Sequence, residues 1–198
     1  MGVPETDERL VRRFQDGSSD AFELLVRRHG TRVYNLCLRI LGDAEEAADA
    51  AQDTFLAALR KLHTFRGDAA FTTWLHRVAV NACYDSLRKK RRRPLLQLAP
   101  EEGDDRPEPS VPTPDHAEGV VRSVDVARAL MEVPEEFRMV LVLADVQDLP
   151  YDEIATVLEI PVGTVKSRVF RGRAALGRAL GMAKGEPSPA SRTSEEEA

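Results

Sequence analysis

Six consecutive basic side chains occupy residues 88–93 of a chain whose net charge is -5. Upstream of them, aromatic and polar side chains recur at intervals that place them on one side of a helix, at about 100° per residue. These are Trp74, Arg77, Asn81, Tyr84 and Arg88. Rings stack on unpaired bases, an amide bonds a base edge, and guanidinium groups neutralise phosphates. The spacing therefore predicts a surface that binds single-stranded nucleic acid.

The opposite side of the same predicted helix is apolar and indicates a core. Its residues are Phe71, Leu75, Val78, Ala79 and Ala82. Two interpretations stay open for Trp74, which is either a stacking residue or a core residue at the helix start. A solvated helix end favoured by the macrodipole accounts for one or two Lys or Arg residues, but not for six.

A second basic segment, residues 160–185, contains six Lys or Arg residues and no acid. Its pattern predicts a helix-turn-helix, with helices over 151–158 and from about residue 162, and a turn through 159–161. The expected buried positions of the second helix are Val165, Val169, Gly172, Leu176 and Leu180. Opposite them lie Lys166, Ser167, Phe170, Arg171 and Ala174. Arg bonds guanine and a ring meets thymine methyl groups, so this face suits duplex DNA; a generic helical hairpin is the alternative.

A third segment lies N-terminal to the two basic ones. Its pattern predicts a helix with one acidic face. The expected core stripe of this helix is Ala48, Ala51, Phe55, Leu59 and Leu62. On its other face, Glu45, Asp49 and Asp53 follow at i, i+4 and i+8, where like charges repel by a few tenths of a kcal/mol each. That face is either simply solvated or a docking site for a basic partner.

Helical periodicity dominates the chain and no alternating strand pattern is evident, so we expect an all-α fold. Residues 93–116 hold six prolines and an acidic cluster, which cannot bury enough apolar surface to fold. We expect two small helical domains, 1–93 and 119–181. A Pro-rich acidic linker, 94–118, joins them, and a disordered tail, 182–198, follows.

Several classes of protein do not fit the sequence. No apolar run could span a bilayer and the N-terminus lacks a signal region, so we expect a cytoplasmic protein with no membrane insertion. Cys37 and Cys83 fall inside helical patterns and are interpreted as buried, reduced thiols. The four histidines show no metal-ligand spacing and no catalytic fingerprint appears, so neither a metal, a cofactor nor an enzyme is expected. A stand-alone repressor would explain the second domain, but not the first.

Three ordered motifs resemble those of bacterial RNA polymerase sigma factors of the extracytoplasmic-function (ECF) group, in the sigma-70 family. The motifs are DAAQDTF at 49–55, FRGDAAFTTWLHRVAVNACYDSLRKKRRR at 65–93 and LPYDEIATVLEIPVGTVKSRVFRGRAAL at 149–176. The stretch TWLHRVAVNAC is similar to the sigma-M branch of that group. One departure is Glu159, where many helix-turn-helix motifs have Gly.

The resemblance implies three groups of site residues. For the minus-10 promoter element they are Phe65, Trp74, Arg77, Asn81, Arg88, Lys89, Lys90 and Arg91. For the minus-35 element they are Thr164, Lys166, Ser167, Phe170, Arg171 and Arg173. For binding core polymerase they are Asp49, Gln52, Asp53 and Leu56. Within the first group, Phe65 and Asn81 are expected to line one pocket for a base flipped from the non-template strand.

The resemblance also implies function and partners. The fold would consist of sigma region 2 and sigma region 4. The chain would bind core RNA polymerase at the clamp helices of the largest subunit and at the flap, and would contact promoter DNA as duplex and as melted strand. It would start transcription of a stress or envelope-response regulon and be held inactive by an anti-sigma factor. The linker acids Glu101, Glu102, Asp104 and Asp105 would lie in the polymerase channel later filled by RNA.

Overall fold

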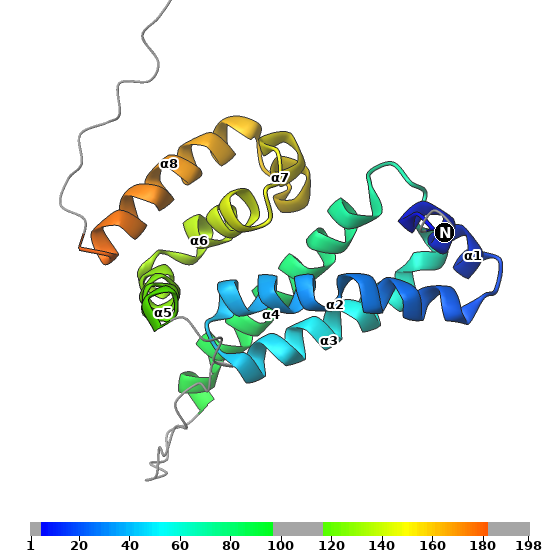
Figure 1. Ribbon diagram of the computed structural model, residues 1–198, viewed down its shortest axis with the longest axis horizontal. Helices are drawn as coiled ribbons and strands as arrows, with labels where there is room; N and C mark the ends of the chain where they lie inside the picture. Colours follow the sequence, from blue (N-terminus) through cyan, green and yellow to red (C-terminus); the bar gives the residue numbers. More distant parts are fainter. Residues whose placement is uncertain (1–4, 97–116, 182–198) are drawn as a thin grey trace, which may run out of the picture.

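The computed structural model describes residues 5–96 and 117–181, with side chains over 5–92 and 125–181. Within these segments all regular structure is helical, and the elements fall into two groups (Figure 1). The first group is α1 (Asp7–Gln15), α2 (Ser19–Leu41), α3 (Ala44–Lys61), η1 (Leu62–Thr64) and α4 (Phe71–Leu96). The second is α5 (Ala117–Glu132), α6 (Glu135–Leu141), η2 (Val142–Val146), α7 (Tyr151–Leu158) and α8 (Val162–Ala179). The predicted linker channel acids and the predicted disordered tail lie outside the described residues.

Local signals define the ends of the first helices. Asp43 caps α3, its carboxylate accepting a hydrogen bond from the Glu46 N–H at 2.8 Å. Gly42 ends α2 in the left-handed region, at φ 76°, and its N–H donates to the Leu38 carbonyl. A Cβ at Gly42 would lie 2.2 Å from the Met131 sulfur of α5. The backbone of the turn between α2 and α3 therefore favours Gly, and a Cβ there would in addition displace the Met131 side chain.

Helix α3 packs between α2 and α4, and this position corrects the predicted core stripe. Ala48 and Leu59, expected inside, are exposed, and Phe55 is half-buried, whereas Leu62 is buried as expected. The buried positions on α3 are Ala47, Ala50, Ala51, Thr54 and Ala58. A helix with a neighbour on two sides buries small side chains, which allow close approach, and its larger apolar residues are then left outside. Ala51 and Leu62 of the predicted stripe are thus buried as expected, whereas the prediction was wrong at Ala48 and Leu59.

The apolar side of α4 is confirmed at Phe71, Leu75, Val78 and Ala79, all buried, while Ala82 is half-buried. In the second group, the helix-turn-helix has the predicted limits. Val165, Val169 and Gly172 are buried, and Leu176 and Leu180 are half-buried. A Cβ at Gly172 would lie 2.9 Å from Leu141, so the crossing of α6 and α8 needs Gly at that position.

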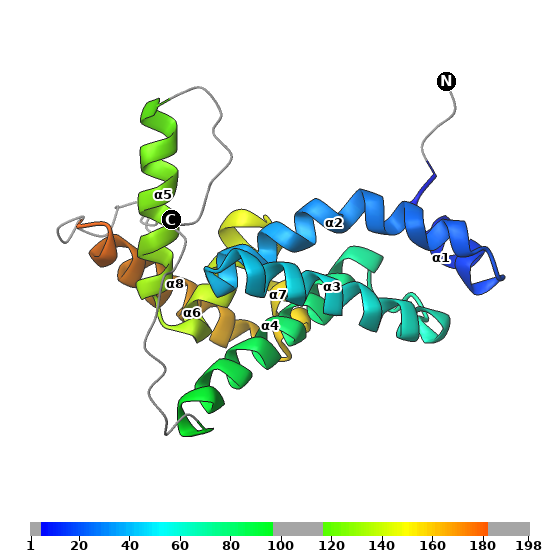
Figure 2. The same cartoon turned by 90° about the horizontal axis from the view of Figure 1, so that it is seen from below.

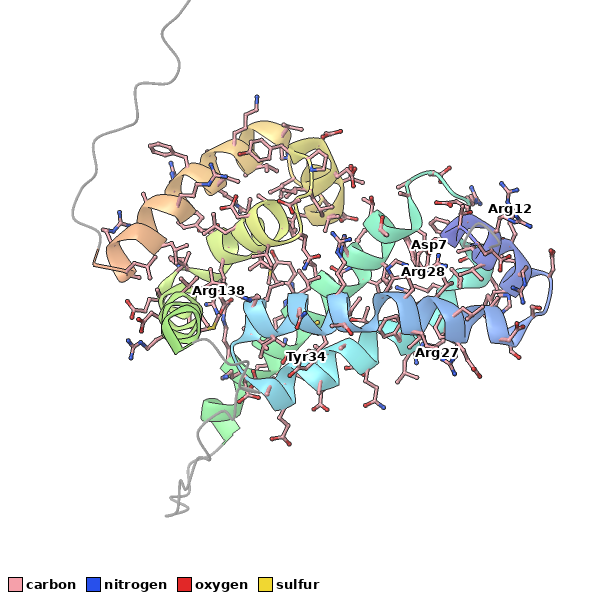
Figure 3. All side chains as sticks on the ribbon, in the orientation of Figure 1. Asp7, Arg12, Arg27, Arg28, Tyr34 and Arg138 are labelled. Atoms are coloured by element: carbon pink, nitrogen blue, oxygen red, sulfur yellow. The ribbon has the colours of Figure 1, made fainter. Side chains whose placement is uncertain are left out.

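The two groups of helices contact each other. Helix α2 meets α5, α6 and η2, and α4 meets α7, as the turned view also shows (Figure 2). Arg138 of α6 lies at this junction, only 8% exposed, and donates to the Ile40 carbonyl at 2.9 Å (Figure 3). Burial lowers the pKa of Arg138, although Glu135 acts in the opposite direction. A buried charge of this kind is tolerated because carbonyl groups accept its hydrogen bonds. Among the described helices none is both long and apolar enough to cross a bilayer.

A histidine of α4 is buried in a positive environment. His76 is 2% exposed, and its Nδ1 has no hydrogen-bond partner in the described part of the chain. Burial, then Arg32 and His29, lower its pKa from 6.5 to about 4. The folded protein therefore holds His76 neutral.

This predicts acid sensitivity that originates at His76. The unfolded chain takes up the proton below its ordinary pKa, and the folded chain does so only near pH 4. Stability is therefore fully present above pH 6.5 and is lost as the pH falls toward 4. The free energy of unfolding of the wild type should fall between pH 7 and pH 5. In His76→Phe this fall should be smaller by about 2 kcal/mol. Urea denaturation at several pH values measures this. His63→Gln, at an exposed position, is the control, and equal pH slopes for wild type and His76→Phe would contradict the prediction.

Candidate nucleic-acid interface

A groove of about 710 Å³ runs between α3 and α4. Its charged lining is six basic residues, Arg60, Lys61, Arg77, Arg88, Lys89 and Arg92, and two acids, Asp53 and Asp85. Trp74 and Asn81 also line it, and Asn81 is exposed. An exposed amide and an indole among guanidinium groups offer base-edge bonding, stacking and phosphate neutralisation at one place. We call this the α3–α4 groove.

A second hollow, the loop pocket, lies over the connection between η1 and α4. It has a volume of about 460 Å³, and its lining includes Phe65, Thr73, Trp74 and Arg77. The ring centroids of Phe65 and Trp74 are 5.3 Å apart, and both rings pack against buried Phe71. The ring of Trp74 is thus half-buried on the core and also borders both hollows. Its stacking on a base stays a prediction.

The resemblance implied that Phe65 and Asn81 line one pocket. The structure instead places them in two separate hollows. Phe65 lines the loop pocket and Asn81 lines the α3–α4 groove. The two hollows share Trp74 and Arg77. The reason is helical rise, since Asn81 lies almost two turns beyond Trp74 on α4, whereas Phe65 precedes the helix.

The basic run at the end of α4 is exposed from Arg88 to Arg92, but its members have different neighbours. Arg88 and Lys89 line the α3–α4 groove. Lys90 pairs with Glu46 of α3 at 3.1 Å. Arg91 pairs with Glu135 of α6. Two residues of the run, Lys90 and Arg91, thus form ion pairs with carboxylates of the same chain.

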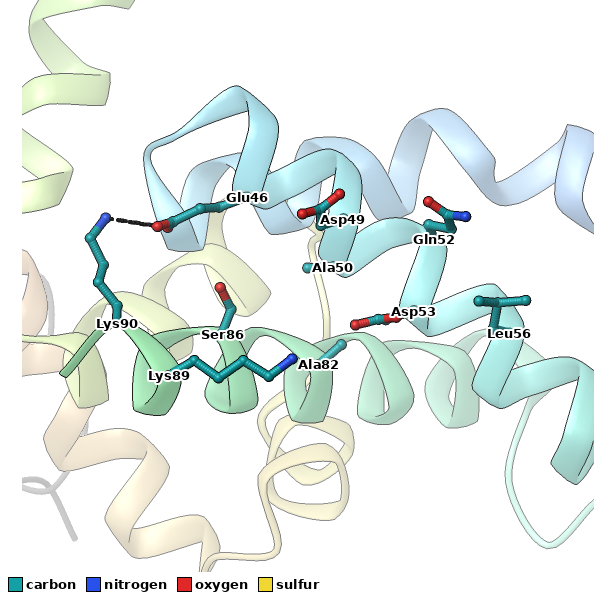
Figure 4. A pocket seen from close by; sticks show the side chains of 10 residues that line it. All are labelled: Glu46, Asp49, Ala50, Gln52, Asp53, Leu56, Ala82, Ser86, Lys89 and Lys90. Carbon is teal, nitrogen blue, oxygen red and sulfur yellow. Dashed lines mark hydrogen bonds and ion pairs between the residues drawn. The ribbon is translucent and has the colours of Figure 1, made fainter. Parts of the chain in front are cut away.

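The four residues predicted to bind polymerase come together on α3. Asp49, Gln52, Asp53 and Leu56 are exposed, and Leu56 is 45% exposed. With Lys89 and Lys90 of α4 they line a hollow of about 380 Å³ (Figure 4). Asp53 borders both this hollow and the α3–α4 groove. We call Asp49, Gln52, Asp53 and Leu56 the acidic face; it adjoins the basic groove directly.

The predicted duplex reader lies along the outer side of α8. Lys166, Ser167, Phe170 and Arg171 are exposed, and Phe170 is 74% exposed. So large an exposed apolar ring indicates a contact surface. Thr164 is half-buried, and its carbonyl accepts the Ser167 hydroxyl at 3.0 Å.

Arg173 differs from the other residues of this group. Its guanidinium makes two hydrogen bonds to Asp145, at 2.6 and 3.2 Å. The hydrogen bond to Asp145 also raises the pKa of Arg173. Arg173 therefore ties α8 to η2, and Arg171 is the guanidinium of this face that is better placed to meet a base.

Arg60 and Lys61 are groove residues that the sequence analysis missed. They end α3 just before the loop, where two basic residues after an acidic helix face are explained by the macrodipole alone. Only the antiparallel packing of α3 on α4 brings them opposite Trp74 and Asn81.

Comparison with known proteins identifies the family. Residues 25–93 match the family model of Sigma-70 region 2, and residues 123–176 match that of Sigma-70, region 4. The RNA polymerase sigma-H factor of Pseudomonas aeruginosa is 38% identical over 188 residues, which cover 91% of this chain and 96% of that protein. The ECF RNA polymerase sigma-E factor of Escherichia coli (strain K12) is 38% identical over 183 residues, 89% and 95% of the two chains.

Solved structures agree with this assignment. CnrH, in complex with the cytosolic domain of CnrY, is 28% identical with a TM-score of 0.66, and the match covers 89% of this chain and 98% of CnrH. The sigma factor RpoE of Bartonella quintana, in complex with the anti-sigma factor NepR, has the same fold at a TM-score of 0.64 and 21% identity, over 82% and 98% of the chains. The two family models and the relatives together show that this chain is a sigma factor of RNA polymerase. Within that class, the chain belongs to the ECF group of the sigma-70 family.

The groove lining generates a prediction for Arg60. If it neutralises a phosphate of a single strand, Arg60→Ala should weaken DNA binding uniformly across sequences and lower the slope of log K against log salt by about 0.7. Fluorescence anisotropy of a labelled single strand, titrated with holoenzyme at several salt concentrations, measures both. Arg27→Ala, an equal charge change at an exposed position of α2, is the matched control. An unchanged salt slope for Arg60→Ala would exclude that role.

Proposed function

We propose that this ECF sigma factor binds the two elements of a promoter with its two basic surfaces, one element on each. The α3–α4 groove and the loop pocket would hold the melted non-template strand of the minus-10 element, and the outer side of α8 would read the minus-35 duplex. The α3–α4 groove carries the proposal, because its six basic residues surround Trp74 and Asn81. A repressor that binds only duplex DNA would not need Trp74 and Asn81 in a basic groove, because the bases of a duplex are already stacked and paired.

The acidic face is the proposed docking site for core RNA polymerase, at the clamp helices of the largest subunit; region 4 would contact the flap. Asp49 and Asp53 are exposed, and within the described residues the ion pair of the neighbouring lysines is made by Lys90 with Glu46 and not with either aspartate. Two like charges that the chain itself does not pair favour docking of a basic partner over a merely solvated face.

Further assignments rest on the resemblance and on the relatives. We propose that residues 1–93 and 119–181 are the functional units and that 94–118 joins them, although α4 continues to Leu96 and α5 begins at Ala117, so the ends of that segment are helical. We also propose that the protein acts in the cytoplasm without catalysis of its own. CnrH is bound by the cytosolic domain of CnrY in its structure, which supports a protein partner for this chain as well, and we propose that this partner is an anti-sigma factor. The regulon would serve a stress or envelope response. Because the stretch TWLHRVAVNAC is similar to the sigma-M branch, we also propose that the chain recognises promoters of the kind used by that branch.

In vitro transcription tests the function as a whole. Wild-type chain and a bacterial core polymerase should start transcription from promoters selected out of a library, and core polymerase alone should not. The variant Asp49→Asn with Asp53→Asn should bind core about tenfold more weakly, because exposed ion pairs contribute up to about 1 kcal/mol each. Its matched control is Glu8→Gln with Asp16→Asn, at exposed positions of the N-terminal helix region. Equal core affinity for both double variants would remove the acidic face from the interface.

Asn81 should be required for promoter opening. Because its side chain is exposed in the α3–α4 groove, Asn81→Ala should leave the fold and core binding unchanged and reduce open-complex formation about tenfold. Permanganate reactivity of thymines on a selected promoter measures opening. Asn35→Ala, at an exposed position of α2, is the control. Full opening with Asn81→Ala would contradict the proposed base contact.

Arg171 and Lys166 should differ in what they contribute at the minus-35 element. Arg171→Ala should cost about 1–3 kcal/mol on the preferred sequence and relax specificity, because a bidentate contact discriminates between bases. Lys166→Ala should cost less and do so uniformly. Competition between selected and scrambled minus-35 duplexes measures the difference, and equal losses on both duplexes for Arg171→Ala would exclude base readout by that residue.

A further inference from the structure

Helix α1 holds the stretch of backbone that leads into the loop pocket. Gln15 is the last residue of α1, and its side-chain nitrogen donates to the carbonyls of Leu62 and Phe65, both at 2.9 Å. Carbonyl oxygens only accept hydrogen bonds, so both N–H groups of this one amide are used at the η1 turn. The residues that line the loop pocket and the α3–α4 groove come from other elements. Helix α1 therefore supports the candidate DNA site from outside and forms no part of its walls.

The hydrogen bond to Phe65 anchors the rim of the loop pocket. The Phe65 ring lines that pocket with its centroid 5.3 Å from that of the Trp74 ring, and the rim continues through residues 66–69. In the part of the chain whose side chains the structure describes, Gln15 is the one side chain that hydrogen-bonds the backbone of Phe65 or of the rim residues that follow. This amide therefore fixes the rim at its first residue.

The helix that carries Gln15 is itself firmly attached to the bundle. Its apolar residues, among them Phe14, are buried, and the centroid of the Phe14 ring lies 4.6 Å from that of His63 in η1. At the start of α1, the carboxylate of Asp7 accepts a hydrogen bond from His29 of α2 at 2.8 Å. The Gln15 amide therefore has a fixed position, from which its two hydrogen bonds orient the backbone of η1.

A carbonyl held by a hydrogen bond fixes the plane of its peptide group and so the direction in which the chain continues. The last carbonyls of a helix have no partner within the helix, and at the end of η1 Gln15 supplies one. Fixing the peptide group after Phe65 determines where the rim residues begin and how the Phe65 ring faces Trp74. A pocket that is ordered in advance does not have to be ordered by its ligand, which raises the affinity for that ligand.

We propose that Gln15 is a positioning residue for base capture in the loop pocket. Its two hydrogen bonds hold Phe65 and the rim in the conformation that receives a base, so that the rim is already ordered when the base enters. Gln15 itself touches no nucleotide and acts through the backbone of Phe65. This inference deepens the proposed function and rests on it, because it requires that the loop pocket takes up a base of the melted strand.

Two variants of Gln15 and one control test this role. Gln15→Leu keeps a similar volume and removes both donors, whereas Gln15→Glu keeps the shape and replaces the donors by acceptors. The control is Thr6→Ala at the opposite end of α1, where the Thr6 hydroxyl accepts a hydrogen bond from the Arg9 N–H at 3.4 Å. Loss of this cap weakens α1 but leaves the hydrogen bond to Phe65 in place.

The first measurement uses Trp74, the single tryptophan of the chain. Its ring is half-buried and borders the loop pocket beside Phe65. In the full chain without polymerase, quenching of its fluorescence by acrylamide should rise in both Gln15 variants, because the rim no longer stays against the ring. Thr6→Ala should match wild type. Wild-type quenching in both Gln15 variants overturns the inference.

The second measurement determines whether the effect depends on a base. Holoenzyme binds a labelled single strand with the non-template minus-10 sequence of a selected promoter, in which each nucleotide in turn is made abasic. The captured base is the one whose removal costs the wild type most affinity. Both Gln15 variants should bind the intact strand about fivefold more weakly, the factor that corresponds to ordering one residue on binding. On the strand that lacks the captured base they should match wild type, and Thr6→Ala should do so on both strands.

The outcomes separate this inference from the proposed function. If Gln15 had only a structural role, its variants would lose the same factor on the intact strand and on the abasic strand. That result, or no loss on either strand, overturns the inference and leaves the proposed function standing, since the wild type still captures a base. A wild type without any position that is sensitive to base removal instead rejects base capture by the loop pocket, and the inference with it.

Discussion

Helix α4 has an apolar side and a basic side, and the rest of the structure depends on keeping the two apart. Burial of Phe71, Leu75 and Ala79 against α2 and α3 fixes the rotation of the helix about its axis. That rotation then determines that Arg77, Asn81 and Arg88 face outward. Hydrophobic burial, which has no direction of its own, thereby orients side chains whose function requires a direction.

The packing of α3 on α4 places opposite charges next to each other without neutralising either surface. The acidic face of α3 and the groove lined by Lys61, Arg88 and Arg92 meet at Asp53. A protein partner with basic groups and a nucleic-acid partner can therefore bind side by side. The net negative charge of the chain disfavours non-specific adsorption to DNA, while the local basic groove still attracts a strand once it is exposed.

The junction between regions 2 and 4 combines contacts of different strength. Arg138 and Gln147 are buried and fully engaged, so their bonds define one relative position. The pairs that Arg77 and Arg91 form with region 4 are more exposed, and such pairs contribute little to stability. Interfaces of this mixed kind within a chain permit relative motion of domains. Specific but weak contact is what a surface needs if another partner must replace it.

The sequence by itself determined the helical class, the two basic segments, the limits of the helix-turn-helix and the outward side of α4. These follow from periodicity and turn residues, which act over a few positions of the chain. The tertiary structure decided that α3 buries Ala47 and Thr54 and leaves Leu59 exposed, because burial depends on how many neighbours a helix has. It also placed Arg60 and Lys61 in the groove, and it separated Phe65 from Asn81. The bonds from Arg138 to Ile40 and from Arg32 to Gln147 join residues 98 and 115 positions apart, a separation at which no local pattern carries information.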